Sequence, residues 1–314
     1  MGIGLLRSAT GTLSQTERSR RLTKLLITGG SGFIGRNLSE QLVEKYEIHA
    51  PCSADLDLLD GADVRRYLCE NRFDVVVHCA TTRSNRWLGA PADLLERNCR
   101  MFFNVARNEA AFGRMIYFGS GAEYDRRCLP ARVKESYFDT QVPADPYGFS
   151  KYICCKYAER SAKILNLRLF AVFGKYEAWQ VRFISNACAR VVHGLPIVIH
   201  QNAVFDYLCV DDLAKVTCWF VENQAKGRAY NVCRGQGYNL TSLAAMVADV
   251  SGVNPDIVVK NEGMAQEYTG DNSLLLRELD GCEFCDMRKC IGELYSWYAA
   301  RKHLIDPTQL RFDE

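Results

Sequence analysis

The sequence predicts an α/β fold, in which a doubly wound parallel sheet is followed by a smaller, mixed C-terminal lobe. Short apolar strand segments alternate with longer helical segments through the first half of the chain, which is typical of parallel sheets with helices on both faces. The strand segments are apolar without alternation, as expected when both faces of a sheet are covered. After about residue 175 this regular order stops, and shorter, mixed elements follow.

These patterns divide the chain into three parts. We expect a flexible leader at 1–23, a sheet domain at 24–175 with a return segment near 203–235, and a lobe over most of 176–314. Apolar runs that end at turn residues place strands at 24–28, 47–50, 74–79, 114–118 and 166–172, and helices at 33–45, 60–71, 93–112 and 147–164. In the second half we expect helices at 183–193, 212–223, 239–251 and 288–302, and strands at 196–199 and 203–209.

Composition excludes several classes of protein. Hydrophobic residues make up 48% and charged residues 24% of the chain, which is ordinary for a globular protein. A net charge of +2 offers no reason to expect nucleic acid or an acidic membrane as a partner. No segment approaches the ~20 apolar residues of a membrane span, and the leader lacks the apolar core of a secretory signal. We expect a cytoplasmic protein.

The chain contains fourteen cysteines, most of them scattered through apolar runs. Cysteines in such runs are typical of small buried side chains in a reducing compartment. Cys282, Cys285 and Cys290 have the first half of the spacing of a zinc knuckle, but only His303 follows them. We therefore expect free thiols and no metal site.

A glycine-rich turn joins the first strand to the first helix. Gly29, Gly32 and Gly35 have a spacing that permits a tight turn and lets backbone N–H groups approach a pyrophosphate at the helix N-terminus. Since the turn has a strand before it and a helix after it, we interpret 24–175 as an NAD(P)-binding domain of the Rossmann type.

The choice between NAD and NADP rests on the end of the second strand. Pro51, Cys52 and Ser53 stand where an acidic residue would bind the ribose of NAD or a basic one the 2′-phosphate of NADP. The missing carboxylate and the nearby Arg36 favour NADP(H) slightly, although a solvated surface role is the simpler interpretation of Arg36.

Tyr147 and Lys151 begin a predicted helix. Their four-residue spacing puts the phenol and the ammonium on one face, where the positive charge can lower the tyrosine pKa from its usual ~10. Such a tyrosine can exchange a proton with a substrate oxygen while hydride moves to or from a nicotinamide. Tyr147 and Lys151 are therefore candidate catalytic residues.

Further motifs follow in a fixed order at residues 28–35, 56–58, 78–80, 98, 118–124, 146–151, 167–174 and 206–212. With these the chain resembles the extended short-chain dehydrogenases/reductases, which include nucleotide-sugar epimerases, dehydratases and 4-keto reductases. The resemblance covers residues 24–281. It implies an NAD(P) cofactor, a sugar substrate and a homodimer, one face of which the 147–164 helix could supply.

The resemblance also assigns roles to single residues. Ser120 takes the place of the hydroxyl that polarises the reacting oxygen, beside Tyr147 and Lys151. The cofactor contacts that it implies, together with those of the glycine turn, are Gly29, Gly32, Phe33, Ile34, Gly35, Asp57, Leu58, Cys79, Ala80, Thr81, Asn98 and Lys151.

Departures from the resemblance reduce the number of reactions that we expect the protein to catalyse. Dehydratases carry an acid pair where this chain has Gly121 and Ala122, and Glu123 lies one place off, so that it should point the other way. The cysteine and histidine of the 3,5-epimerising reductases are also missing. Reduction of a keto-sugar by Tyr147 is the leading expectation, with an NAD-dependent sugar 4-epimerase as the alternative. A catalytically silent NAD(P)-binding regulatory protein is the alternative from another class.

The substrate contacts depart from the resemblance as well. An expected asparagine is Ala171, and two expected diphosphate-binding arginines are Phe205 and Tyr268. Aromatic side chains cannot pair with phosphate as arginine does. Cations at Lys175, Arg182 and Arg190 are candidate replacements, although solvated helix faces also explain them. We keep Lys175, Arg182 and Phe205 as candidate contacts of a sugar that is expected to carry a nucleotide.

Overall fold

The computed structural model describes residues 22–82 and 91–310, so that nearly all of the predicted leader lies outside the described residues. Six parallel strands form the central sheet in the order β10-β5-β4-β3-β1-β2. These strands are β1 (Lys24–Thr28), β2 (Glu47–His49), β3 (Phe73–His78), β4 (Phe112–Ser120), β5 (Ile164–Leu169) and β10 (Ala229–Val232). The sheet confirms the predicted fold class.

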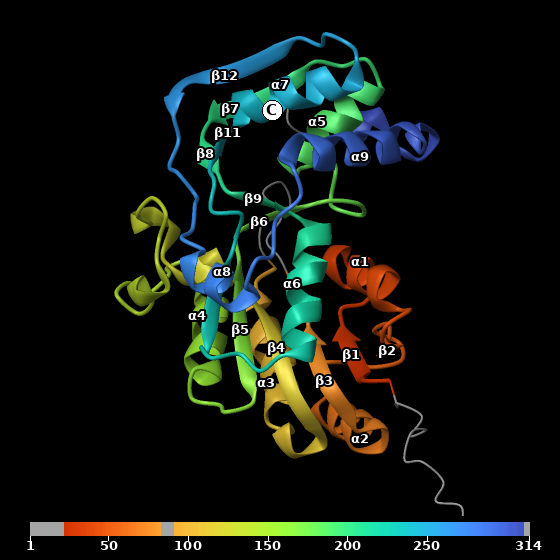
Figure 1. Cartoon of the computed structure of the whole chain (residues 1–314), viewed down its shortest axis with the longest axis vertical. Coiled ribbons are helices and arrows are strands. Elements are labelled where there is room, and N and C mark those ends of the chain that lie inside the picture. The colour runs from red at the N-terminus through yellow and green to blue at the C-terminus, as the bar shows by residue number, and fades with distance from the viewer. Residues whose placement is uncertain (1–21, 83–90, 311–314) are drawn as a thin grey trace, which may run out of the picture.

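Helices cover both faces of the sheet (Figure 1). One face packs against α1 (Phe33–Leu42), α6 (Val210–Glu222) and α8 (Ser273–Leu279), and the other against α2 (Gly61–Asn71), α3 (Leu94–Ala106) and α4 (Pro146–Ala158). Successive strand residues divide between the two cores: Leu25 and Ile27 face the first, and Leu26 the second. Within the described part of the chain, no helix is long and apolar enough to cross a membrane.

The strand order reverses at β1. The chain passes from β1 to β2 on one side and then crosses back to β3 on the other. The carboxyl ends of the strands on either side of such a reversal leave a crevice, where open α/β sheets bind their ligands. Gly29 lies in this crevice with φ +68°, and a Cβ atom there would come within 2.9 Å of the backbone of Ala80. Only glycine fits at this position without strain.

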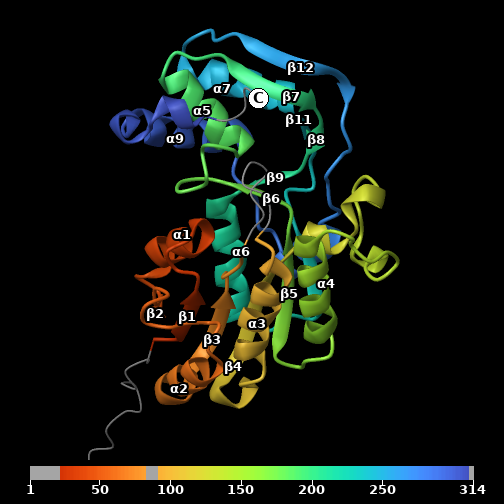
Figure 2. The same ribbon diagram turned by 180° about the vertical axis from the view of Figure 1, so that it is seen from behind.

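The C-terminal lobe has its own apolar core, which includes Ile184, Leu243 and Ile291. It is built from α5 (Phe183–Val192), α7 (Leu240–Ser251) and α9 (Met287–Ala299), with β7 (Ile197–Asn202) paired to β12 (Ile257–Met264) and β8 (Val204–Phe205) to β11 (Tyr238–Asn239). Figures 1 and 2 show the lobe at one end of the molecule and the sheet at the other, with β6 (Ala171–Phe173) and β9 (Tyr207–Cys209) between them.

Several predicted bounds were wrong. The strand expected at 166–172 is broken at Phe170, because the chain leaves the sheet there and β6 pairs with β9. The helices expected at 93–112 and 147–164 end earlier, at Ala106 and Ala158. The last residues of each predicted range belong to the turn before the next strand and to the first residue of that strand, Phe112 of β4 or Ile164 of β5. The elements β10, β12 and α8 were not predicted. The packing of α8 against the sheet shows that the end of the chain also contributes to the sheet side of the molecule.

Candidate active site

A cavity of about 910 Å³ brings the predicted catalytic residues together. Ser120, Tyr147 and Lys151 all line it, although they come from two different elements. Four of the predicted cofactor contacts line it as well: Phe33, Ile34, Cys79 and Thr81. Its remaining walls come partly from β4, β5 and the segment after β4, and partly from the C-terminal lobe, so that the sheet domain and the lobe enclose one site.

Tyr147 and Lys151 lie in the first turns of α4. The helix begins at Pro146, where the missing N–H costs nothing, and the Asp145 carboxylate caps it by accepting from the Gly148 N–H at 2.8 Å. Lys151 is buried, and its Nζ donates to the carbonyl of Phe118 at 2.8 Å. This ammonium lies 5.9 Å from the centre of the Tyr147 ring. The carbonyl of β4 thus holds the positive charge beside the phenol.

Ser120 is fixed at the carboxyl end of β4. Its Oγ accepts a hydrogen bond from the N–H of Ala122 at 3.1 Å, and its own N–H donates to Glu123 Oε1 at 3.0 Å. The Glu123 carboxylate also accepts from the guanidinium of Arg168 at 2.6 Å, and both partners of this pair are almost completely buried. Glu123 therefore points away from the cavity, as predicted, and its carboxylate holds the backbone of Ser120.

The glycine turn offers backbone donors at the other end of the site. Gly32 is the N-cap of α1, and among the described residues no side chain caps this helix. The turn is closed by a bond from the Gly32 N–H to the carbonyl of Gly29 at 2.9 Å. Gly35 packs so closely on Gly29 that a Cβ there would lie 2.3 Å from that carbonyl oxygen. The first amides of α1 are thereby placed at the crevice, in the arrangement that binds an anionic group.

Two other predicted cofactor residues, Ala80 and Asn98, form hydrogen bonds that fix the segment after β3 at the crevice. Ala80 donates its N–H to Thr28 Oγ1 at 3.3 Å, which ties the end of β3 to β1. Asn98 accepts from the N–H of Thr82 at 2.7 Å and donates to its carbonyl at 2.9 Å. Its amide also donates to the hydroxyl of Ser150 in α4 at 3.2 Å. Asn98 thus connects the segment after β3 to α4, the helix that carries Tyr147 and Lys151.

The remaining residues predicted near the cofactor lie outside the cavity. Asp57 Oδ1 accepts from the N–H of Leu59 at 2.9 Å, and the carbonyl of Leu58 accepts from Asn104 at 2.9 Å, so that both belong to the approach to α2. Arg36 stacks on the ring of Tyr176, 3.7 Å from its centre. Its place on the outer surface of α1 agrees with the simpler interpretation of that arginine.

Only some of the predicted substrate contacts line the large cavity. Arg182 and Phe205 line the large cavity, whereas Lys175 lines a separate cavity of about 220 Å³. The backbone carbonyl of Lys175 accepts from Asn37 at 2.8 Å, which fixes this segment against α1. Arg190 is buried and donates to Asn186 at 2.9 Å, so that the interpretation as a solvated cation was wrong.

Arg126 and Tyr268 also line the cavity. Arg126 was not predicted from the sequence, and Tyr268 was predicted only as the residue that stands where a diphosphate-binding arginine is expected. The guanidinium of Arg126 stacks on the ring of Tyr268, 4.8 Å from its centre. The Tyr268 ring also packs against Phe170 and Phe205, with centroid distances of 5.1 and 5.9 Å. Burial raises the pKa of Tyr268 to about 12. The place of Arg126, six residues after Ser120 at the carboxyl end of a sheet strand, was a usable signal.

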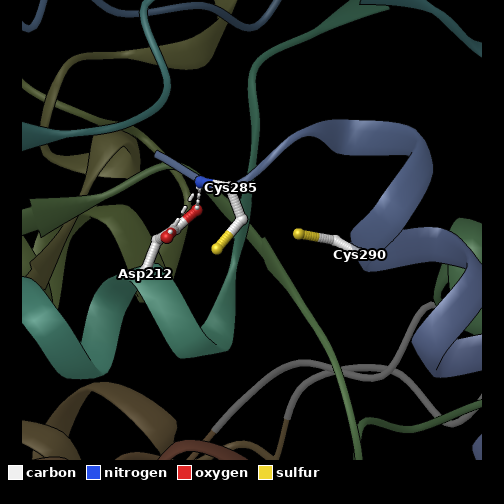
Figure 3. A group of neighbouring side chains, drawn as sticks. All are labelled: Asp212, Cys285 and Cys290. Carbon is white, nitrogen blue, oxygen red and sulfur yellow. Dashed lines mark hydrogen bonds between the residues drawn. The ribbon is translucent and has the colours of Figure 1, made fainter. Parts of the chain in front are cut away.

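The cysteines near the C-terminus meet an acidic residue that the sequence did not connect with them. Asp212, Cys285 and Cys290 bring their side-chain oxygen and sulfur atoms within 4.8 Å of one another (Figure 3). The ammonium of Lys215 donates to Asp212 Oδ1 at 2.8 Å and to Cys285 Sγ at 3.0 Å. The Lys215 ammonium therefore forms hydrogen bonds with two of the three side-chain atoms that would have to bind a metal ion. We retain the prediction that these cysteines are free thiols.

Residues 25–233, more than half of the chain, match the model of the NAD dependent epimerase/dehydratase family. The chain belongs to this family. The resemblance to extended short-chain dehydrogenases/reductases is thereby confirmed, and the protein is an enzyme that uses NAD(P).

Relatives within the family act on activated sugars. The GDP-L-colitose synthase of Yersinia pseudotuberculosis is 22% identical over 80% of this chain and 90% of its own length. The GDP-6-deoxy-D-talose 4-dehydrogenase of Aggregatibacter actinomycetemcomitans is 24% identical over 87% of this chain and 97% of its own. Both matches extend over nearly the whole fold of this family member.

Solved structures agree with the architecture. The GDP-mannoheptose C4 reductase of Campylobacter jejuni, with NADP bound, superposes with a TM-score of 0.76 at 20% identity, over 88% of this chain and 98% of its own. The UDP-glucose 4-epimerase of Thermotoga maritima has the same TM-score and identity, over 90% and 100% of the two chains. Because reductases and epimerases match equally well, the likeness shows the fold, and the residues of the site must decide the reaction.

Proposed function

We propose that this family member is an NADPH-dependent reductase of a 4-keto-sugar carried on a nucleoside diphosphate. The proposal rests on one observation: Ser120, Tyr147 and Lys151 line the same cavity, together with Phe33 and Ile34 from the start of α1. The positions where a dehydratase needs acids hold Gly121 and Ala122, and the nearest carboxylate, Glu123, is paired with Arg168 away from the cavity. Proton transfer at a single oxygen is the chemistry that these residues support.

The reaction needs one proton and one hydride for each carbonyl group. The nicotinamide, when bound, supplies the hydride to the carbonyl carbon. Tyr147 donates its phenolic proton to the carbonyl oxygen, and Ser120 donates a hydrogen bond to the same oxygen and so polarises the C=O bond. The ammonium of Lys151, held beside the ring by the carbonyl of Phe118, stabilises the negative charge that forms on Tyr147.

The cofactor fits the carboxyl ends of β1 and β3. The amides at the start of α1 would hold the pyrophosphate, and Cys79 and Thr81, which line the cavity, would lie along the cofactor. We infer NADPH rather than NADH because no acidic residue directly follows β2, at positions 50–53. The similar structure of the C4 reductase contains NADP, which supports the same choice.

The substrate end of the cavity combines aromatic rings with cations. Phe170, Phe205 and Tyr268 line one wall, and the two guanidinium groups of Arg126 and Arg182 reach the same space. Arginine pairs bidentately with phosphate, and rings of this kind cover the faces of a sugar or a base. We infer that Arg126 and Arg182 bind the diphosphate in place of the two arginines that are expected at positions 205 and 268 and are absent from this chain.

We also infer a homodimer in a reducing compartment such as the cytoplasm. The helices α3 and α4 pack side by side, and Phe103 and Tyr157 on them meet edge to face at 5.3 Å while Tyr157 stays 37% exposed. A second copy would cover this aromatic pair. All fourteen cysteines are free thiols, which agrees with such a compartment.

A substrate panel tests the proposed function. Purified enzyme is mixed with NADPH and with GDP-, ADP- or UDP-linked 4-keto-sugars, and the loss of NADPH absorbance is followed. We expect oxidation with at least one nucleotide series, and no oxidation when the same keto-sugar lacks the nucleotide. Tight NADPH binding without oxidation by any member of the panel would instead support the silent regulatory protein.

A further inference from the structure

A second group of reactive side chains lies outside the large cavity. Asp212 and Lys215 belong to α6, which packs against the sheet. Cys285 lies in the segment between α8 and α9, and Cys290 lies near the start of α9 in the core of the lobe (Figure 3). The group therefore lies where the sheet domain meets the lobe, and none of its four members lines the large cavity.

Hydrogen bonds hold Cys285 through its backbone and its sulfur. Its N–H donates to the two oxygens of the Asp212 carboxylate at 3.1 and 3.0 Å, and its carbonyl accepts from the guanidinium of Arg234 at 2.6 Å. Its sulfur accepts from the ammonium of Lys215 at 3.0 Å. The same ammonium donates to Asp212 at 2.8 Å, which fixes the positive charge beside the sulfur.

The ammonium of Lys215 makes Cys285 the more reactive of the two thiols. A positive charge beside a cysteine favours the thiolate, which is the form that attacks oxidants. Small oxidants can reach this sulfur, because Cys285 is half-buried and the side chain of Lys215 is 47% exposed. Cys290 is only 4% exposed. The neighbouring Cys209 and burial raise the pKa of the Cys290 thiol, which therefore stays protonated.

Cys290 is placed to react with an oxidised Cys285. The two sulfur atoms lie within 4.8 Å of each other, and the side chain of Cys290 points toward Cys285 in Figure 3. Both side chains pack in the core of the lobe. Cys282, the other cysteine of this segment, packs against the core of the sheet instead. Cys290 is therefore the thiol that shares its surroundings with Cys285.

We propose that Cys285 is a peroxide-sensitive thiol and that Cys290 is its resolving partner. The sulfur of Cys285 attacks hydrogen peroxide, so that an S–O bond forms, the O–O bond breaks, and the departing hydroxide takes up the proton of the Cys285 thiol as water. The sulfur of Cys290 then attacks the sulfenic acid: the S–S bond forms, the S–O bond breaks, and hydroxide leaves with the Cys290 proton as a second water. The two thiols lose two electrons and the peroxide gains them. Transient disulfides of this kind are the ones that occur in reducing compartments.

Oxidation of the full chain tests the inference without any sugar substrate. Reduced protein is treated with hydrogen peroxide, the remaining thiols are alkylated, and the peptides are mapped by mass spectrometry. We expect a Cys285–Cys290 disulfide, reversed by dithiothreitol, to form before the exposed Cys128 is oxidised. A bond from Cys285 to Cys282 or to Lys215, or earlier oxidation of Cys128, would overturn the inference.

Two serine variants separate the two steps. In Cys290→Ser the disulfide cannot form, so that we expect a sulfenic acid to accumulate at Cys285, where dimedone traps it. In Cys285→Ser we expect Cys290 to stay reduced, because no sulfenic acid forms for it to attack. Oxidation of Cys290 in the second variant, or no trapping at Cys285 in the first, would contradict the assigned order.

Lys215→Met tests the role of the ammonium as a positioning charge. We expect dimedone trapping of Cys285 at neutral pH to slow about tenfold, whereas Lys215→Arg keeps the charge and should react at nearly the wild-type rate. Lys289→Met is the matched control, because Lys289 precedes Cys290 in the chain but its ammonium pairs with Glu293 at 3.9 Å. Equal rates in Lys215→Met and Lys289→Met would show that the Lys215 charge does not activate Cys285.

Discussion

The backbone of Ser120 is held by a carboxylate that does not line the cavity. Glu123 and Arg168 form an ion pair in which both side chains are at most 1% exposed, and Glu123 also accepts from the N–H of Ser120. Removing one partner of such a pair leaves a buried charge and costs about 3–5 kcal/mol. The stability of the pair thus holds the backbone of Ser120 in place.

Tyr147→Phe tests the catalytic assignment. The change removes one hydroxyl at the reacting centre, and we expect turnover to fall by roughly 10²- to 10⁴-fold with little change in the dissociation constant of NADPH. Rates come from NADPH absorbance, and binding from quenching of protein fluorescence. Tyr152→Phe, on the same helix, is the control, because its hydroxyl pairs with Asp139 outside the cavity. Activity of the Tyr147→Phe variant near that of the wild type would contradict the proposed role of Tyr147 as the proton donor.

The sequence predicted the residues that a short motif keeps close together. Tyr147 and Lys151 are one helical turn apart, so that their proximity needs only a helix. Arg126 and Tyr268 are 142 positions apart and meet only because α8 and the segment before it return to the sheet. Lys175 is a candidate substrate contact because of its charge, but the backbone of its segment is hydrogen-bonded to Asn37 of α1 and its side chain does not line the large cavity. Residue types and spacing cannot reveal contacts that depend on such long-range packing.

The glycine turn is the element on which cofactor binding depends. In Gly32→Val a branched side chain would stand at the N-cap of α1, where the pyrophosphate is expected, and its Cβ would already lie 3.2 Å from the carbonyl of Gly29. We expect at least a tenfold weaker binding of NADPH, a loss of about 1.4 kcal/mol, measured by calorimetry.

Gly292→Ala is the control for this prediction. Gly292 lies in α9, and a Cβ there would come no closer than 3.8 Å to its neighbours. This variant should bind NADPH as the wild type does. If Gly32→Val also kept the wild-type dissociation constant, the turn would have no part in binding the pyrophosphate.

Asp206 connects the segment before β9 to the loop after β10, and it makes this connection dependent on pH. Its carboxylate accepts from the N–H groups of Arg234 and Gly235 at 2.7 and 2.8 Å. Burial nevertheless raises its pKa from 3.8 to about 6. Because the folded state binds this proton more tightly, the stability gained from it is complete below pH 3.8 and is lost as the pH rises through 6.

Asp206→Asn should remove this dependence. The pKa difference of about two corresponds to an effect on the order of 3 kcal/mol, at ~1.4 kcal/mol per pKa unit. The wild type should therefore lose stability relative to the variant between pH 4 and pH 7, as measured by urea unfolding at both values. A difference between the two proteins that stayed constant over this range would show that Asp206 does not titrate there.

The element predictions failed where the chain leaves its regular pattern. Residues 166–172 form one apolar run, and nothing in it marks Phe170 as the point where the chain passes from the sheet to the lobe. β12 is exposed along its whole length, so that its sequence carries no buried face to recognise. The strands β1, β3 and β4 were predicted because each has apolar residues buried in the cores on the two faces of the sheet.

At the scale of the whole molecule, the site lies between two cores. The sheet domain supplies Ser120 from β4 and Tyr147 and Lys151 from α4. The lobe with its connecting strands supplies Arg182 and Phe205. Because β1 and β4 run parallel, the glycine turn after β1 lies at the same end of the sheet as Ser120 at the end of β4. The fold could be predicted from alternating strands and helices, whereas the substrate wall depends on how the lobe packs against the sheet.

The ratio of NADPH consumed to sugar converted distinguishes a reductase from an epimerase. With the best substrate of the panel, NADPH oxidation is followed by absorbance while the sugar product is counted by chromatography. We expect one NADPH to be oxidised for each keto-sugar reduced, with turnover stopping when NADPH is exhausted. Interconversion of sugar epimers with no net loss of NADPH, sustained by a trace of retained NAD, would contradict this expectation and would identify a 4-epimerase.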